Sequence, residues 1–178
     1  MELLFTGLLH TGDTPEKDNL DDKEWVISYL KSWGLNVPEP DGDGIARLKT
    51  LRNAIKSIIL AVNEGKSPDE DDLREIVSAL AGSQMTFALT APVGEFRLSL
   101  QPVKKDWDWA LHQIAASFAQ VLASGEIKRI KVCENDACRR IFYDESKNLA
   151  RRWCGTACGN LMNVREYRKR QKEKEQEG

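Results

Sequence analysis

The sequence predicts a mainly helical α+β protein, with a helical N-terminal domain that contains one β-hairpin and a small C-terminal module. Three observations lead to this fold class. Apolar residues recur at helical spacing through most of the first 125 residues, between clear start and stop signals. Residues 85–100 change to strand-like alternation. All four cysteines lie within 26 residues near the C-terminus, so we expect two domains, at residues 1–125 and 126–178.

Three of the expected helices have clear signals at both ends. Aspartates precede them, as N-capping residues do, and glycines follow, where a helix can close in the left-handed conformation. Residues 36–44 contain two prolines and two glycines and predict a loop after the first helix. The start and stop residues are Asp21 or Asp22 to Gly34, Asp43 to Gly65, and Asp106 to Gly125.

A further helix, third in chain order, is expected after Ser67-Pro68-Asp69-Glu70, which resembles a capping box with proline at the first helical position. After it, residues 85–90 and 95–100 alternate apolar and polar side chains, and residues 91–94 contain proline and glycine. This pattern predicts a β-hairpin. The helix is expected to bury its four apolar residues at helical spacing, Leu73, Ile76, Val77 and Leu80.

The composition is that of a water-soluble globular protein, with 41% hydrophobic and 30% charged residues. No apolar run approaches the ~20 residues of a membrane span, and Glu2 stands where an export signal carries basic residues. We therefore expect a cytoplasmic protein without membrane contact. Residues 1–125 have 12 basic and 19 acidic side chains, a net charge of −7, whereas residues 126–178 have 14 and 9, a net charge of +5. A polyanion would therefore bind the C-terminal module.

The cysteines follow the spacing C-x4-C-x15-C-x3-C, with Cys133 and Cys138 as one pair and Cys154 and Cys158 as the other. Two close pairs separated by a dozen or more residues can supply the four corners of a zinc tetrahedron. Residues 133–138 have the length of a knuckle between two short strands, and residues 158–174 predict a helix with the second pair in its first turn. This layout predicts a treble-clef finger around one structural Zn²⁺.

Other uses of the four cysteines remain open. Two disulfides would need the same residues, but they do not persist in a reducing cytoplasm. A redox pair is usually C-x-x-C near a βαβ unit, and the sequence has neither. With four cysteine ligands there is no open position for a catalytic water, so the expected metal is structural.

The C-terminal module resembles the CGNR zinc finger in Arg151-Arg152-Trp153-Cys154, Cys158-Gly159-Asn160 and Phe142-Tyr143-Asp144. That finger usually follows a helical ABATE domain in proteins described as stress-induced transcription regulators, and residues 47–52 resemble the long helix of that domain. The resemblance implies zinc binding and suggests DNA binding by the finger. The sequence departs from the family name at its fourth letter, because Leu161 replaces the arginine.

A basic surface on the C-terminal helix is the candidate for contact with double-stranded DNA. Positions 161, 165, 168 and 172 form one helical stripe that carries two arginines and a lysine. One alternative is a solvated helix in which Glu166 pairs with Arg170, so that the finger is a purely structural appendage. The other is a protein-protein interaction adaptor whose finger docks a partner and binds no nucleic acid. The candidate DNA-binding residues are Arg151, Arg152, Arg165, Arg168, Lys169, Arg170 and Lys172.

The sequence contains no recognisable catalytic motif, so we expect no enzyme. The two histidines, His10 and His112, do not lie in a catalytic pattern. Five tryptophans could line a pocket for a small-molecule effector, but at helical spacing most should be core, and the sequence identifies no ligand-binding residues. One chain offers few phosphate contacts, so useful DNA affinity would require a homodimer.

Overall fold

The computed structural model describes residues 3–9 and 18–176. The long helices and the two small antiparallel sheets confirm the mainly helical α+β class. In chain order the elements are the 3₁₀ helices η1 (Thr6–Leu9) and η2 (Asn19–Asp21), α1 (Lys23–Ser32), α2 (Gly42–Asn63), α3 (Glu70–Ala81), β1 (Met85–Thr90), η3 (Pro92–Gly94), β2 (Arg97–Pro102), α4 (Trp107–Ala123), η4 (Glu126–Arg129), β3 (Ile130–Val132), β4 (Ile141–Tyr143) and α5 (Thr156–Gln176).

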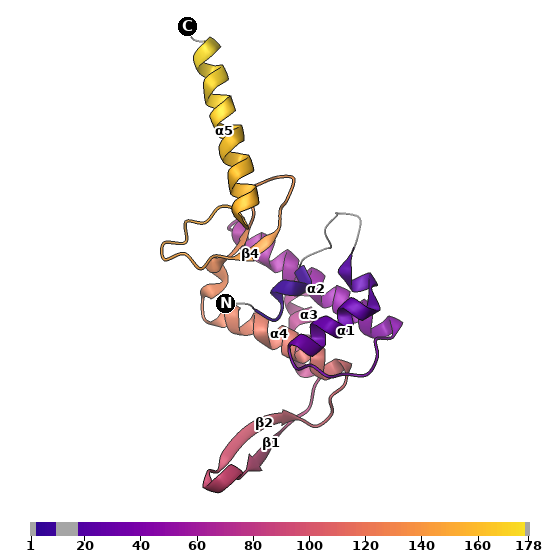
Figure 1. Ribbon diagram of the computed structural model, residues 1–178. Coiled ribbons are helices and arrows are strands. Elements are labelled where there is room, and N and C mark those ends of the chain that lie inside the picture. Colours follow the sequence, from indigo (N-terminus) through magenta and orange to yellow (C-terminus); the bar gives the residue numbers. More distant parts are fainter. Residues whose placement is uncertain (1–2, 10–17, 177–178) are drawn as a thin grey trace.

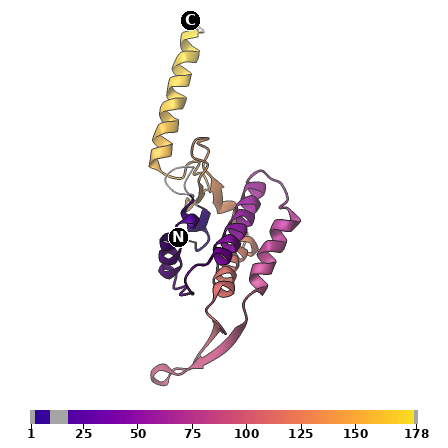
Figure 2. The ribbon, with the colours of Figure 1, turned by 90° about the vertical axis from the view of Figure 1, so that its right-hand side faces the viewer.

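The core of the body lies between η1, α1, α2 and α4, and α3 covers the other side of α2 and α4 (Figures 1 and 2). Phe5 and Phe118 meet edge to face in this core, with ring centroids 5.1 Å apart. Helix α2 lies close to α4 at Gly44, where an added Cβ would lie 2.7 Å from the Trp107 ring. The glycine therefore allows the two helices to pack.

The aspartate caps lie close to their predicted positions. Asp22 accepts hydrogen bonds from the first turn of α1, and Asp106 accepts one from Trp109 N–H at 3.1 Å. Helix α2 starts one residue before the predicted Asp43, because Asp41 caps it through Gly44 N–H at 2.7 Å. The three expected stop glycines all have a left-handed φ near 70°, and they are Gly34, Gly65 and Gly125.

The prediction for the start and burial of α3 was partly wrong. Asp69, not Ser67, caps the helix by accepting from Asp71 N–H at 2.8 Å, so Pro68 lies before the first turn. Ile76 is the residue that is fully buried, whereas Leu73 and Val77 are exposed. The helix lies at the outside of the body against α2 and α4, so only a narrow stripe of it is covered.

The predicted hairpin is present, and it extends away from the body (Figures 1 and 2). Its strands pair antiparallel from Met85 opposite Pro102 to Thr90 opposite Arg97. The connection is one 3₁₀ turn at η3, and Gly94 has a φ of 84° there. The second strand begins two residues later than expected.

The C-terminal module packs on the body through β3 and β4. Ile130 and Ile141 belong to the same buried cluster as the body core, and Asn63 at the end of α2 donates to the Ile130 carbonyl at 2.9 Å. Helix α5 then projects from the end of the molecule opposite the hairpin (Figure 1). Among the described residues no helix is long and apolar enough to span a membrane.

Candidate zinc centre and basic helix

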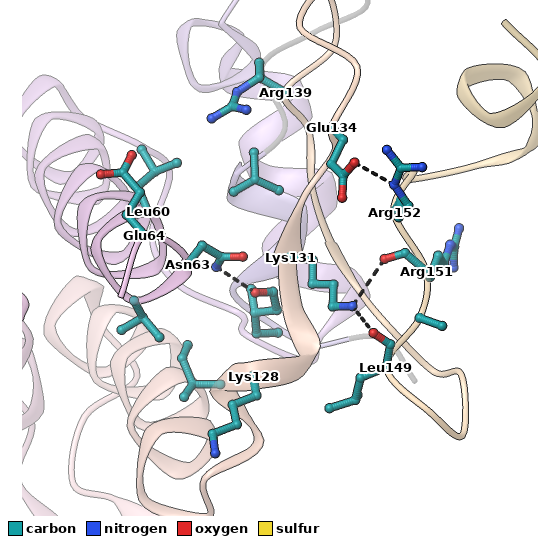
Figure 3. Close-up of a pocket in the computed structure, with 15 residues that line it drawn as sticks. Leu60, Asn63, Glu64, Lys128, Lys131, Glu134, Arg139, Leu149, Arg151 and Arg152 are labelled. Atoms are coloured by element: carbon teal, nitrogen blue, oxygen red, sulfur yellow. Dashed lines mark hydrogen bonds and ion pairs between the residues drawn. The ribbon is translucent and has the colours of Figure 1, made fainter. Parts of the chain in front are cut away.

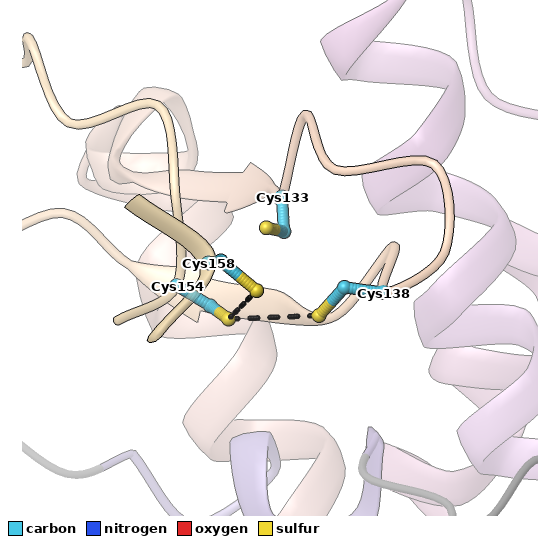
Figure 4. Close-up of side chains that lie close together, drawn as sticks. All are labelled: Cys133, Cys138, Cys154 and Cys158. Atoms are coloured by element: carbon cyan, nitrogen blue, oxygen red, sulfur yellow. Dashed lines mark hydrogen bonds between the residues drawn. The ribbon is translucent and has the colours of Figure 1, made fainter. Parts of the chain in front are cut away.

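The first cysteine pair lies on a tight knuckle between β3 and β4 (Figure 4). Cys133 directly follows β3, is fully buried, and donates its N–H to the Arg140 carbonyl at 2.8 Å. Cys138 N–H donates to the Asn135 carbonyl at 2.8 Å. Arg139 has a φ of 48°, so the chain turns sharply after the second cysteine. The knuckle predicted between two short strands is therefore present.

The second pair lies at the start of α5, but not both members in its first turn as predicted. Helix α5 begins at Thr156, so Cys154 precedes it and Cys158 is its third residue. Gly159 N–H donates to the Gly155 carbonyl at 3.0 Å, which orders the turn between them. The positive end of the helix favours a thiolate at Cys158.

The four sulfurs have the separations that a tetrahedral zinc site needs. All four Sγ atoms lie within 4.8 Å of one another, with Cys138 and Cys154 at 3.6 Å and Cys154 and Cys158 at 3.8 Å. Zinc–sulfur bonds of about 2.3 Å give tetrahedral edges of about 3.8 Å. All four residues are free cysteines, so neither pair forms the disulfide considered above. The chain thus positions four cysteines to hold one structural zinc ion.

The electrostatics of the cluster also favour a bound cation. Burial, together with hydrogen bonds that the Cys154 thiol donates to neighbouring sulfurs, raises the pKa of Cys154 to about 12. The hydrogen bond from Asn135 lowers the pKa of Cys158. Four thiolates at these distances repel one another, so a divalent cation is the group that lets all four ionise.

Asn135 is a site residue that the sequence analysis missed. It is buried, and its amide Nδ2 donates to Cys158 Sγ at 3.4 Å while its Oδ1 accepts from Ala137 N–H at 3.3 Å. One side chain therefore orders the knuckle and orients a sulfur of the other pair. The sequence signal is an amide residue inside the knuckle.

Asp144 is the second missed residue, and it anchors the connection from β4 to the second cysteine pair. Its fully buried carboxylate accepts from Ser146 N–H at 2.9 Å and Arg151 N–H at 3.0 Å, and it pairs with Lys131 Nζ at 2.9 Å. Burial opposes ionisation, but the bonds from Lys131, Ser146 and Arg151 hold the pKa of Asp144 well below its usual range. The carboxylate is therefore charged at all ordinary pH values.

The structure places Arg151 and Arg152 within the finger. Arg151 Nε donates to the Trp153 carbonyl at 2.9 Å, its Nη2 donates to the Cys154 carbonyl, and the guanidinium lies over the Phe142 ring. Arg152 pairs with Glu134 at 2.7 Å and, from Nη1, with Glu166 at 3.5 Å. Arg151 thus links β4 to the segment before α5, Arg152 links the knuckle to α5, and neither guanidinium donates to a cysteine sulfur.

The other five candidate residues form an exposed basic surface on α5. Arg168 has no hydrogen-bond partner among the described residues, and Arg165 approaches only Met162 Sδ at 3.9 Å. The pair predicted between Glu166 and Arg170 is not formed, because Glu166 pairs with Arg152 and Arg170 Nε donates to the Glu166 carbonyl at 3.4 Å. The surface consists of Arg165, Arg168, Lys169, Arg170 and Lys172, all exposed.

A cavity of about 670 Å³ lies where the finger meets the body (Figure 3). The end of α2, strand β3 and residues 149–152 line it. Two acidic lining residues are already paired, Glu134 with Arg152 and Glu64 with Lys66. Lys128 and Arg139, near its ends, have no ion pair among the described residues. Trp107 and Trp109 are buried in the core, away from this cavity.

His112 is held within the body. Its Nδ1 lies 2.7 Å from the Leu80 carbonyl, which links α4 to the end of α3. This contact supports a structural histidine on α4. His10 lies outside the described residues.

Fold and site together define a two-part protein, with a helical body and a small zinc finger that carries a basic helix. Two family comparisons match these parts. The CGNR zinc finger matches residues 129–171, and the ABATE family, described as "Putative stress-induced transcription regulator", matches residues 1–125. The chain therefore belongs to the ABATE family and carries a CGNR zinc finger. Both are regulator or zinc-finger families, not enzyme families. No curated protein matches the chain.

Proposed function

We propose that this chain is a transcription regulator that binds double-stranded DNA through α5 of its zinc finger. The observation that carries the proposal is the exposed basic surface of α5, which projects clear of the body (Figure 1). Helix α5 has 21 residues, a length of about 30 Å, and an α-helix fits the major groove of B-DNA. Arginine side chains suit both phosphate oxygens and guanine edges.

The cysteine cluster has a structural role in this proposal. It fixes the base of α5 to the knuckle, so that the helix is presented in one orientation. Four thiolate ligands leave no open position for a reacting water, so we assign the chain no catalytic activity. We place its action in the cytoplasm, where reducing conditions keep the thiols available for zinc.

Arg151 and Arg152 have a supporting role in the proposed contact. Their guanidinium groups are largely used inside the finger, which leaves the five basic residues of α5 as the main contact surface. Arg152 also pairs with Glu166, which is the acidic residue next to Arg165 in the chain. Glu166 therefore does not compete with phosphate for the Arg165 guanidinium. The net effect is a helix surface on which Arg165 and Arg168 are available to phosphate.

We further propose that the cavity between finger and body is where a small-molecule effector binds. Its walls belong to both parts of the chain, so a ligand there would contact α2 and the residues that lead to α5. Lys128 and Arg139 favour an anionic ligand, and the apolar residues Leu60, Ile127 and Val132 favour one with an apolar portion.

A protein-interaction adaptor is the second candidate, because α5 also exposes apolar side chains. Leu161, Val164 and Tyr167 are exposed at spacings of three residues along the helix. Such a strip suits a partner protein better than a phosphate backbone. A DNA-binding protein differs from an adaptor because its affinity for duplex DNA falls steeply as the salt concentration rises.

The test is reversal of charge on α5. We expect Arg165→Glu with Arg168→Glu to weaken binding of the zinc-loaded protein to duplex DNA by roughly 100-fold or more at low salt, because two phosphate contacts are lost and repulsion replaces them. Fluorescence anisotropy with labelled duplexes measures the affinity.

The matched control has the same change in net charge, Lys31→Glu with Arg74→Glu, at exposed positions on the body. It should lower the affinity only slightly. Equal losses in the two double variants would mean that α5 is not the contact surface, and no duplex binding by the wild-type chain would favour the adaptor.

A further inference from the structure

The β1–β2 hairpin has one apolar face and one polar face. Directly paired residues lie on the same face of an antiparallel ribbon, and alternate residues do so along each strand. The pairs Phe87 with Leu100 and Leu89 with Leu98 therefore share one face. The opposite face carries the pairs Thr86 with Gln101, Ala88 with Ser99 and Thr90 with Arg97. This pattern is that of a strand pair with one side buried in a core.

Nothing in the described part of the chain covers the apolar face. Phe87 is 70% exposed, Leu89 and Leu98 are each 66% exposed, and Leu100 is 55% exposed. Phe96, just before β2, is 79% exposed. Met85 at the base of the hairpin packs against the body core, and the rest of the hairpin extends beyond α1 to α4 (Figures 1 and 2). A two-stranded ribbon is marginally stable alone in water, so a covering surface would stabilise it.

We propose that this apolar face is a homodimer interface, in which the hairpins of two chains pack face to face. The face carries no charged residue, so an identical face can approach it without burying an unpaired charge. Apolar side chains of this kind offer roughly 100 Å² each, or roughly 500 Å² per chain. Two copies reach the total of about 1,000 Å² that a specific interface needs.

The same facts disfavour other occupants. A nucleic acid needs cations, and this face has none; Arg97 belongs to the polar face. The interface also lies at the end of the molecule opposite α5, so it leaves the basic surface free (Figure 1). The dimer interface is inferred from the hairpin alone. Only its role in DNA binding rests on the proposed function, because a dimer would supply the second set of phosphate contacts.

The test compares Phe87→Ser with Leu98→Ser, on the apolar face, against Thr86→Ser with Gln101→Ser on the polar face of the same strands. Sedimentation equilibrium of the full zinc-loaded chain from about 1 to about 100 µM measures the mass. We expect the wild-type chain and the polar-face variant to approach twice 20.1 kDa as concentration rises. The apolar-face variant should remain a monomer, with an unchanged circular dichroism spectrum because the substituted side chains are exposed.

Three outcomes would overturn the proposal. The wild-type chain could be monomeric at every concentration, or the dimer could persist in the apolar-face variant. The third is a monomer that binds neutral lipid vesicles in a flotation assay in a way that depends on Phe87. The DNA proposal fails separately. A monomer that binds duplex DNA contradicts only the dimer, and a dimer that binds none contradicts only DNA recognition.

Discussion

At the scale of single residues, the zinc centre depends on a side chain that is not a cysteine. The Asn135 amide donates to Cys158 Sγ, and its backbone carbonyl accepts from Cys138 N–H, so it contacts both pairs. Hydrogen bonds to a ligand sulfur fix its direction and offset part of the negative charge of four thiolates. This residue therefore couples knuckle geometry to metal affinity.

Replacement of Asn135 by alanine should weaken zinc binding by roughly 10- to 100-fold, because the sulfur loses its donor and the knuckle loses the Oδ1 acceptor for Ala137 N–H. Competition with a chromophoric chelator measures the affinity. The control is Asn148→Ala, an exposed asparagine of the same module. An Asn135→Ala affinity within twofold of the control would contradict the assigned role.

The spacing of the cysteines was sufficient to predict the zinc ligand type and the knuckle, because two close pairs have few other uses in a reducing compartment. The aspartate caps Asp22 and Asp106 were also predictable, because an N-cap acts on its own next turn. The role of Asn135 was not, because its sulfur partner lies 23 residues later in the chain. Such a contact depends on the folded path between the two pairs.

At the scale of elements, the connection from β4 to α5 is ordered by one buried carboxylate. Asp144 binds two backbone N–H groups of the connection and the Lys131 ammonium from β3. Lys131 in turn donates to the carbonyls of Leu149 and Arg151 (Figure 3). The pair thus sets the position at which the chain enters the second cysteine pair.

Asp144→Asn should lower the free energy of unfolding by about 2–3 kcal/mol, because Lys131 keeps its charge and loses its buried partner. In the wild-type chain the pKa of Asp144 is lower in the folded state than its unfolded value of about 3.9. The carboxylate therefore stabilises the fold above that pH, and this stability is lost only as the pH falls below it. The difference between wild type and variant should thus be constant from about pH 8 to about pH 5. Urea unfolding measures it.

The control for this prediction is Asp71→Asn, which breaks an exposed pair with Arg74 and should cost less than about 1 kcal/mol. Equal effects of the two substitutions, or a difference that already shrinks between pH 8 and pH 5, would show that the Asp144 carboxylate does not anchor the connection.

Helical periodicity predicted where the helices lie but not how deeply each is covered. Helix α3 has the expected apolar stripe, yet Leu73 and Val77 are exposed because no element packs outside it. The hairpin was likewise predicted from alternation, whereas the exposure of its apolar face was not. A pattern shows which side of an element is apolar, and only the arrangement of the elements shows what covers that side.

At the scale of the whole molecule, the two parts share one core. Ile130 and Ile141 come from the strands of the finger but are buried with the body residues, and Asn63 links α2 to β3. The sequence indicated two parts with opposite charge, because charge and cysteine spacing are properties of each segment. Their contact, and the cavity at their junction, depend on side chains more than 60 residues apart.

Because the finger and the body share one core, we expect bound zinc to order the contact between them as well as the finger itself. Strands β3 and β4 hold the knuckle on one side and cover the body core on the other. Helix α5 has little contact with the body, so its direction depends on the cysteine cluster and on the pairs of Arg152 with Glu134 and Glu166. DNA binding by α5 should therefore need zinc.

The most direct measurement is duplex affinity by fluorescence anisotropy over a salt series, for the same chain with zinc and after chelation. We expect the zinc-loaded chain to bind, with a loss of affinity of roughly 40- to 500-fold between about 50 and 200 mM salt for three to five phosphate contacts per chain. The chelated chain should lose this affinity at every salt concentration. Equal binding with and without zinc, or an affinity that does not change with salt, would contradict DNA recognition by a zinc-ordered α5.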